Sequence, residues 1–254
     1  SRLNDNVEML FVRHDMFYRR DGLYGTSQGD YPDNLLRFSF LCKQGMSLLR
    51  EQGFKADIYH ANDWQTALVP LLLKSRAEDP FFKKARSVYT VHNMAFQGWA
   101  PVTKFPTLGV DERYRGVLEF KSQINLMKGG LLSAHRVNTV SPAYAGEIRT
   151  PAFGCSLEFV LQLIAPKLSG ILNGIDYRVW NPATDENIHA AYSSKRMEGK
   201  DANKTELIKE FGLRGAKARM LIGMVTRLSE QKGMDILLPA LEKMLEKHSV
   251  IILG

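Results

Sequence analysis

Arg227 and Lys232 lie five residues apart in the segment "GMVTRLSEQKGMDILLPALEKML". An apolar run precedes the two cations and predicts a β-strand, while an apolar period of about 3.6 residues follows them and predicts a helix. The start of a helix presents unpaired N–H groups and a partial positive charge, so it favours an anion. Arginine can hold phosphate oxygens in a fork, and lysine adds a mobile charge. The pair is therefore a candidate phosphate site, with two solvated loop cations as the alternative.

Polar side chains also follow two earlier apolar segments. In "HANDW", Asp63 could accept a hydrogen bond from a substrate hydroxyl or cap the next helix, and Trp64 could stack on a sugar face or pack in the core. In "VHNMAFQG", His92 ends an apolar run and Asn93 brings two donors and an acceptor. A lone histidine in such a place is more often structural than catalytic. Three polar clusters after three strands nevertheless favour a site.

The same order of signals occurs four times: an apolar or β-branched run, a polar cluster and a helical period. Alternating strands and helices are typical of a parallel sheet covered by helices, which predicts an α/β fold. Such sheets carry function at the carboxyl ends of their strands, where the polar clusters fall. Strands are predicted within residues 56–64, 85–93, 134–142 and 219–228, and a further strand at 249–253.

Two helices of the first part have clear boundary signals. Residues 34–51 have a helical pattern, which Gly53 closes. Ser141 is predicted as an N-cap, because Pro142 suits the first position of a helix.

The helix after the two cations is predicted to begin near Asp235, because Pro239 is tolerated only near a helix start. The spacing of its apolar residues predicts a single buried stripe. The stripe comprises Leu237, Leu238, Leu241, Met244 and Leu245.

The composition is that of an ordinary soluble protein, with 254 residues, 44% hydrophobic and 24% charged. The net charge of +7 is dispersed, which gives no support for nucleic-acid binding and suits an anionic small substrate. No apolar run reaches the roughly 18 residues of a membrane span, so no membrane is expected. Cys42 and Cys155 are predicted to be free thiols, because two cysteines are too few for a disulfide framework or a zinc site.

Several catalytic motifs are missing from the sequence. It contains no H-E-x-x-H and no G-x-x-x-x-G-K-[ST] loop. It has no D-x-D, which disfavours transferases that hold a pyrophosphate through a carboxylate-bound metal. No G-x-G-x-x-G follows a strand, which argues against a nicotinamide-dependent oxidoreductase. If the chain handles a diphosphate, side-chain cations must neutralise it, and no metal is expected.

The pattern changes between about residues 165 and 190, where Asn-Gly and Asn-Pro turn signals replace any sustained period. We predict a boundary there, with a first domain in residues 1–170 and a second region in residues 171–254. The chain starts in an apolar segment with little preamble and stops at a strand pattern, so we expect a fragment of a longer protein.

These clusters, in this order, resemble the bacterial glycogen synthase and plant starch synthase family of glucosyltransferases. The resemblance implies the GT-B architecture: two Rossmann-like parallel-sheet domains across a cleft, both incomplete here. Residues 1–170 would be part of the N-terminal acceptor-side domain, and residues 171–254 the interdomain segment and the start of the C-terminal nucleotide-sugar-binding domain. The matching stretches are "YPDNLLRFSFL", "HANDWQTALVPLLLK", "TVHNMAFQGWAP", "INLMKGGLLSAHRVNTVSPAYAGEI", "LSGILNGIDYRVWNPATD" and "TRLSEQKGMDIL".

The same resemblance implies a retaining enzyme that moves glucose from ADP-glucose to the non-reducing end of an α-1,4-glucan in glycogen or starch synthesis. The partners are then a nucleotide sugar and a glucan acceptor, without cofactor or metal. The preference for ADP-glucose over UDP-glucose follows from the resemblance alone. The expected compartment is the bacterial cytoplasm, with the plastid stroma as the alternative.

The resemblance also assigns roles to residues. Arg227 and Lys232 match the pair that neutralises the donor diphosphate. Asp63 and His92 match residues that line the cleft at the transferred sugar and the acceptor, and these four are the expected catalytic residues. The expected substrate-binding residues are Tyr24, Trp64, Asn93 and Asn173, of which Trp64 rests on its residue type rather than on the resemblance.

The sequence also departs from the family pattern. The N-terminal K-x-G-G-L loop of that family is absent, and so are the E-x-C-G and G-G-L segments that complete its donor site towards the C-terminus, so the chain as printed is expected to be inactive. In "FGCSLEFVL", Ser156 stands where such enzymes tend to carry glycine. A noncatalytic glucan- or nucleotide-binding protein on the same fold is the alternative, and an activity assay separates the two.

Overall fold

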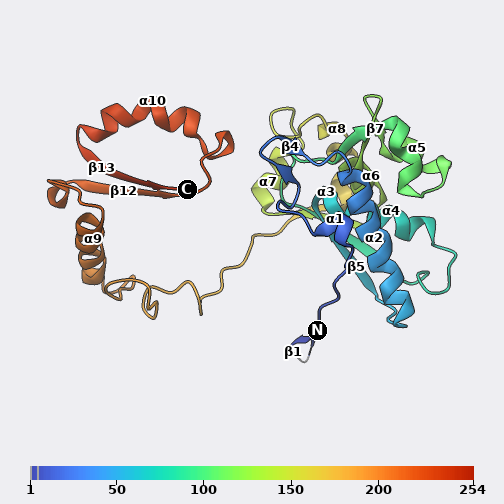
Figure 1. The fold of residues 1–254 in the computed structure, drawn as a ribbon, viewed down its shortest axis with the longest axis horizontal. Helices are drawn as coiled ribbons and strands as arrows, with labels where there is room; N and C mark the ends of the chain where they lie inside the picture. Colours follow the sequence, from blue (N-terminus) through green and yellow to red (C-terminus); the bar gives the residue numbers. More distant parts are fainter. Residues whose placement is uncertain (1, 5) are drawn as a thin grey trace. The chain divides into compact units, whose positions relative to one another are not determined.

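The computed structural model describes residues 2–4 and 6–254. The chain divides into two compact units, Ser1–Asn173 and Gly174–Gly254, which are called unit 1 and unit 2 below. Figure 1 shows the helices and strands of each. In the described part of the chain, no helix is long and apolar enough to cross a lipid bilayer.

Unit 1 is built around a four-stranded sheet in the order β11-β10-β6-β5. All neighbouring strands in it are parallel, as the alternation of strand and helix signals predicted. Three of the strands lie within predicted segments, whereas β11, which has only three residues, was not predicted from the sequence. The strands are β5 (Ile58–Asn62), β6 (Arg86–Val91), β10 (Arg136–Thr139) and β11 (Leu168–Gly170).

The helices of unit 1 pack against this sheet and against one another. The helix α4 contacts β5, β6, α2 and α6, while α7 contacts β10 and β11. The helix α2 has the predicted bounds, and Gly53 beyond its end has a φ of +69°. The helices are α1 (Asp15–Tyr18), α2 (Asn34–Glu51), α3 (Asp63–Thr66), α4 (Leu68–Ser75), α5 (Arg115–Leu118), α6 (Leu126–Ser133), α7 (Pro142–Glu147) and α8 (Glu158–Leu163).

The predicted N-cap of α7 is confirmed. Ser141 Oγ accepts a hydrogen bond from the N–H of Tyr144 at 2.9 Å, and Pro142 is the first residue of the helix. This satisfies one of the N–H groups that a helix start leaves unpaired.

Three small antiparallel sheets complete unit 1. One lies between β6 and α6 in the chain and has the order β7-β9-β8. The other two are hairpins, β1 with β2 and β3 with β4. The bounds are β1 (Arg2–Asn4), β2 (Val7–Glu8), β3 (Gly25–Thr26), β4 (Gly29–Asp30), β7 (Trp99–Pro101), β8 (Glu119–Phe120) and β9 (Gln123–Asn125).

The core of unit 1 surrounds the central strand β6. Tyr89 and Val91 of β6 are buried together with Leu71 and Leu72 of α4 and Leu131 of α6. Full burial of a leucine-sized side chain stabilises a fold by about 1.5–3 kcal/mol. The packing therefore fixes the carboxyl end of β6, where the candidate residues begin.

Unit 2 contains a single strand–helix–strand unit in which β12 and β13 are parallel, as predicted. Between β11 and α9 the chain forms only turns and bends, apart from a bridge between Ser193 and Arg196. The elements are α9 (Glu198–Glu210), β12 (Met220–Val225), α10 (Met234–Leu245) and β13 (His248–Leu253).

The prediction of a buried stripe on α10 was wrong. Leu238 and Leu245 are 60% and 47% exposed, and no residue of α10 is buried. Two strands offer too narrow a surface to cover adjacent leucines over three turns. The predicted start near Asp235 is confirmed, because α10 begins at Met234, one residue earlier. Pro239 is its sixth residue, where a proline removes one helical hydrogen bond.

Candidate functional site

The candidate residues of unit 1 lie where its parallel strands end. Asp63 follows β5, His92 and Asn93 follow β6, and Asn173 comes three residues after β11. Since parallel strands place their carboxyl ends at one edge of a sheet, these side chains belong to one edge. The structure thus gathers polar residues from segments that are distant in the sequence.

Asp63 is bonded directly to the next strand end. Its Oδ1 atom accepts a hydrogen bond from the backbone N–H of His92 at 2.8 Å. Asp63 is the first residue of α3 and has a φ of +52°, whereas Asn62 takes the N-cap position. Asp63 is therefore not the N-cap of α3, which was the alternative to a role in the site. A positive φ is uncommon outside glycine, although aspartate tolerates it better than most residues do.

The imidazole of His92 is held by the residue before Asp63. Its Nε2 atom lies 3.1 Å from Asn62 Oδ1, and an amide oxygen can only accept a hydrogen bond. In the neutral imidazole, this arrangement assigns the ring proton to Nε2 and leaves a lone pair on Nδ1. The backbone and the ring of His92 are thus both oriented by the end of β5 and the residue after it. The sequence patterns did not single out Asn62.

Asn93 opens a loop that is fixed by further amide groups. Its Oδ1 atom accepts a hydrogen bond from the N–H of Ala95 at 2.9 Å, which forms a local turn. Further along, Gln97 Nε2 donates to the carbonyl oxygens of Met94 and Cys155 at 3.0 and 2.9 Å. Gln97 Oε1 accepts from Asn125 Nδ2 at 2.6 Å. The loop after His92 is therefore ordered by buried polar contacts.

Trp64 takes the packing role of its two alternatives. It is 9% exposed and lies edge-to-face against Phe38, with ring centroids 4.7 Å apart. The ring of Tyr24 lies 6.4 Å from Trp64 and 6.0 Å from Phe38, and Tyr24 is 44% exposed. Tyr24 is thus an accessible aromatic ring that lies against Trp64, the residue after Asp63 in the chain.

A row of polar side chains crosses the sheet just before its carboxyl edge. Thr90 Oγ1 donates to Asn138 Oδ1 at 2.6 Å and lies 2.6 Å from His60 Nε2. A hydroxyl has one proton, so Thr90 accepts from the Nε2–H of His60. This row joins β5, β6 and β10 and stiffens the edge that carries Asp63 and His92.

Asn173 is exposed, and its side chain makes no hydrogen bond with the residues that the structure describes. The strand pairing continues close to it, because the N–H of Ile171 donates to the carbonyl oxygen of Thr139 at 2.8 Å.

The second group of candidate residues lies in unit 2. Arg227 and Lys232 both fall on the connection between β12 and α10, and both are exposed. Neither side chain forms a hydrogen bond or ion pair with any described residue. Lys232 ends a short 3₁₀ turn, Glu230–Lys232, and Gly233 with a φ of +76° leads directly into α10. Both charges are therefore available to an anion.

Burial shifts the pKa values of a phenol and a thiol in unit 1. Burial raises the pKa of Tyr89 well above its usual value, to which the charge of Asp63 adds, so this phenol stays neutral. Both cysteines are free, and burial raises the pKa of Cys42 to about 12. Across residues 2–4 and 6–254, no three His, Cys, Asp or Glu residues form a cluster that could hold a metal ion.

The chain is an α/β protein, and its similarity to a solved glycosyltransferase structure shows the GT-B class, as predicted. The structure is similar to that of the "Catalytic domain of Starch Synthase IV from Arabidopsis thaliana bound to ADP and acarbose". The TM-score is 0.82 and the sequences are 34% identical, over 95% of this chain and 50% of that chain.

The chain belongs to the family described as "Starch synthase catalytic domain", which matches residues 1–163. It is 43% identical to Glycogen synthase 2 of Geobacter sulfurreducens over 251 residues, which are 98% of this chain and 52% of that protein. It is also 43% identical to the glycogen synthase of Opitutus terrae over 236 residues, 92% of this chain and 49% of that protein. The chain therefore spans about half the length of the curated relatives it matches.

Proposed function

We propose that the full-length protein transfers glucose from ADP-glucose to the non-reducing 4-hydroxyl of an α-1,4-glucan, with retention of configuration. Membership of the starch synthase catalytic domain family and the similarity to bacterial glycogen synthases support this reaction. The starch synthase IV structure was obtained with ADP and acarbose bound. ADP is the group that ADP-glucose would release, which supports a nucleotide diphosphate as one ligand.

The observation that carries the proposal is the pair of unpartnered cations between β12 and α10. When the bond between glucose C1 and the β-phosphate oxygen breaks, the electron pair leaves with ADP and negative charge builds on that phosphate. Arg227 and Lys232 would stabilise this charge more in the transition state than in the ground state. The acceptor oxygen bonds to C1 on the same face, and its proton passes to the departing phosphate oxygen. The scheme needs no resident metal and no covalent nucleophile.

Unit 1 supplies groups that suit the sugar. The Asp63 carboxylate can accept from a hydroxyl, the Nδ1 lone pair of His92 can do the same, and the amide of Asn93 can donate. These three groups come from two neighbouring strand ends whose relative position is fixed by the bond between Asp63 and His92. In this proposal they orient the transferred glucose and the incoming glucan, and Tyr24 provides the ring surface.

The test is incorporation of labelled glucose from ADP-glucose into a glycogen primer by the full-length protein. Lys232→Ala should lower kcat by about 100-fold, the usual effect of removing one group that stabilises developing charge. Lys243→Ala is the matched control, because Lys243 is also exposed and lies on the adjacent helix α10. Equal turnover of the two variants would contradict the assigned role of Lys232.

The same assay separates the enzyme from a noncatalytic binding protein. A binding protein would show saturable affinity for ADP or for maltoheptaose by calorimetry but no incorporation of label. Dialysis against EDTA is expected to leave the rate unchanged, because cations of the chain neutralise the diphosphate. A rate that falls with EDTA and returns with Mg²⁺ would contradict this part of the proposal.

A further inference from the structure

Arg37 is a buried cation near the start of α2. It is 3% exposed and is the fourth residue of the helix. Burial of a charge is costly, and a cation in the first turns of a helix opposes the helix dipole. Among the described residues, no carboxylate forms an ion pair with Arg37. The unfavourable burial of the Arg37 charge must therefore be offset by other contacts of its guanidinium.

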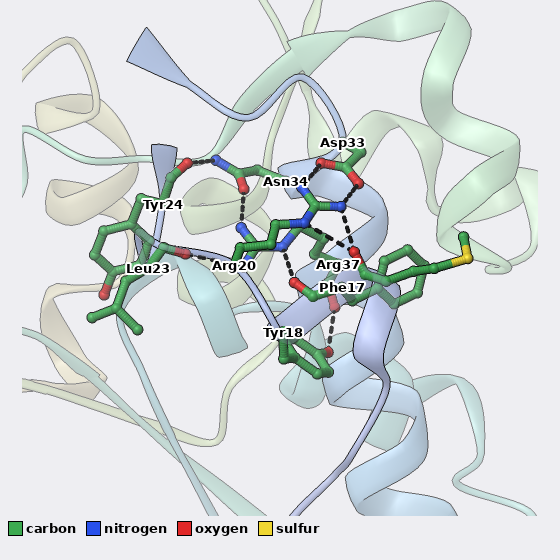
Figure 2. A network of polar contacts seen from close by, with 9 residues as sticks. Phe17, Tyr18, Arg20, Leu23, Tyr24, Asp33, Asn34 and Arg37 are labelled. Atoms are coloured by element: carbon green, nitrogen blue, oxygen red, sulfur yellow. Dashed lines mark hydrogen bonds and ion pairs between the residues drawn. The ribbon is translucent and has the colours of Figure 1, made fainter. Parts of the chain in front are cut away.

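The guanidinium of Arg37 joins three separate points of the chain (Figure 2). Nε donates to the carbonyl oxygen of Phe17 at 2.8 Å, and Nη2 donates to that of Leu23 at 3.1 Å. Nη1 donates to Asn34 Oδ1 at 2.6 Å. The segment before α2 is therefore attached to the helix at both of these carbonyl groups.

Asn34 extends the attachment to Tyr24. Its Nδ2 atom donates to the carbonyl oxygen of Tyr24 at 2.8 Å, while its Oδ1 atom accepts from Arg37 (Figure 2). The carbonyl oxygen of Tyr24 also accepts from the N–H of Tyr31 at 2.9 Å, across the hairpin of β3 and β4. Hence the backbone of Tyr24 is bonded from two sides, and one side depends on Arg37 through Asn34.

A second arginine closes the same segment. Arg20 donates to both carboxylate oxygens of Asp33 at 2.8 and 2.7 Å and to the carbonyl oxygen of Met16 at 2.9 and 2.7 Å. The hydrogen bond from Arg20 lowers the pKa of Asp33. Residues 20–33 thus form a loop that is closed at its base, and Arg37 fixes the part of that loop that carries Tyr24.

Packing alone does not hold this loop. Tyr24 and Arg37 both line a cavity of about 490 Å³, so the loop has open space on one side. On the other side, the Tyr24 ring meets Trp64, which directly follows Asp63 in the chain. A shift of the loop would therefore change how the Tyr24 ring packs against Trp64.

We propose that Arg37 is a positioning residue that holds Tyr24 against Trp64, the residue that follows Asp63 in the chain. This inference rests on the proposed function, in which Tyr24 provides the ring surface for the sugar. A planar guanidinium has donors pointing in three directions, so it can reach Phe17, Leu23 and Asn34 together. A lysine at this position has a single nitrogen and cannot span them, which makes Arg37→Lys a selective test.

The first experiment measures the loop without measuring activity. Amide hydrogen exchange of residues 18–31 is followed in the full-length protein, with the Tyr31 N–H as the reporter of its bond to Tyr24. Arg37→Lys should speed exchange in this segment by about 10-fold or more, as expected for a loop that opens locally. Arg50→Lys is the matched control, because Arg50 is on α2 as well, ion-paired with Asp79. Unchanged exchange in Arg37→Lys, or equal change in both variants, would overturn the proposal.

The second experiment tests whether the effect passes through Tyr24. Arg37→Lys should lower kcat/KM for the glucan by about 10- to 100-fold, since small displacements in a site have effects of this size. In a Tyr24→Ala background, Arg37→Lys should cause little further loss, because the ring to be positioned is gone. The same loss in both backgrounds would refute positioning through Tyr24.

If Arg37→Lys folds poorly, Asn34→Asp serves as the second variant for the exchange experiment. It keeps an acceptor for Arg37 but removes the donor to Tyr24, so it should speed exchange at Tyr31; exchange like that of the parent would contradict the inference. If the full-length protein shows no glucosyl transfer, the proposed function fails while the exchange experiment still decides whether Arg37 fixes the loop. If transfer is normal in Tyr24→Ala, the link from Arg37 to the reaction is refuted.

Discussion

The backbone N–H of His92 donates to Asp63 Oδ1 at 2.8 Å, which ties the residue after β6 to the residue after β5. Asn62 Oδ1 holds the His92 ring at 3.1 Å, so two adjacent residues of one strand end orient both parts of His92. Asp63 reaches this position with a φ of +52°, a conformation that costs an ordinary residue about 1–2 kcal/mol. The carboxylate and the imidazole therefore form one rigid unit, and a change at Asp63 also acts on His92.

This relationship predicts different results for two substitutions of Asp63. Asp63→Asn keeps an acceptor for the His92 N–H and tolerates a positive φ, so the free energy of unfolding should change little. The loss of charge should lower kcat/KM by about 10- to 100-fold, because this factor corresponds to the free energy that a hydrogen bond to a charged group contributes. Asp63→Ala should lose as much activity and about 1–2 kcal/mol of stability as well. Denaturant titration and the transfer assay separate the two effects.

The outcome for Asp63→Asn decides between a positional and a chemical role. Full activity in this variant would mean that only the bond to His92 matters. Unchanged stability of Asp63→Ala would show that the backbone at this position is not constrained by the side chain.

Alanine substitutions at Gly98, in the loop after His92, and at Gly53, after α2, test how tightly that loop packs. Both have a φ of +69°, but a Cβ at Gly98 would lie 2.7 Å from Trp64 Cε3, whereas a Cβ at Gly53 has nothing within 4 Å. Gly53→Ala should cost about 1–2 kcal/mol, from the backbone conformation alone. Gly98→Ala should cost a further 1–3 kcal/mol or so, because the ring of Trp64 must move. The midpoints of thermal unfolding of the two variants, measured by calorimetry, give the difference. Equal shifts of the two midpoints would show that the Trp64 ring moves aside without a cost in stability.

Much of the fold could be predicted because its signals are local. The apolar runs of β5, β6 and β10 and the polar residues that end them gave both the parallel sheet and the edge that carries Asp63 and His92. The helix α2 was predicted to the residue because Gly53 marks its end. The short strand β11 was missed, since three residues show no period.

The features that were missed depend on contacts between distant residues. The turn of Asp63 toward His92 requires β6 beside β5, and the burial of Trp64 requires Phe38 from α2. Nothing in the residue type of a tryptophan distinguishes a core position from a sugar platform. Arg37 stands in a segment that carried the family resemblance, yet its three bonding partners could not be read from one stretch of sequence.

The two cysteines should differ strongly in reactivity. Cys42 is buried, its Sγ donates to the carbonyl oxygen of Gln65 at 3.4 Å, and burial raises its pKa to about 12. Because the thiolate is the reactive form, Cys42 should resist iodoacetamide at pH 8 in the folded protein. Cys155 is exposed and should be alkylated, though slowly, since partial burial raises its pKa as well. Peptide mass spectrometry after native labelling checks this, with labelling in guanidinium chloride as the control. Rapid native labelling of Cys42 would contradict the packing described for α2.

His135 should make the stability of unit 1 depend on pH. Its Nδ1 atom accepts from the N–H of Ser87 at 3.0 Å, so protonation of Nδ1 would break this bond. Partial burial lowers the pKa of His135, and the nearby cations lower it further: Arg86, Lys167, Arg136 and Lys74.

Since the folded pKa lies below the unfolded value of about 6.5, the unfolded chain binds more protons between the two. The free energy of unfolding should therefore fall as the pH drops below about 6.5 and level off below the folded pKa of His135. His135→Asn keeps an oxygen that can accept from Ser87 and removes the titrating group. Melting temperatures between pH 7.5 and 5.5 should then depend less on pH in the variant than in the parent. Parallel curves for the two proteins would show that the histidine titrates alike in the folded and unfolded states.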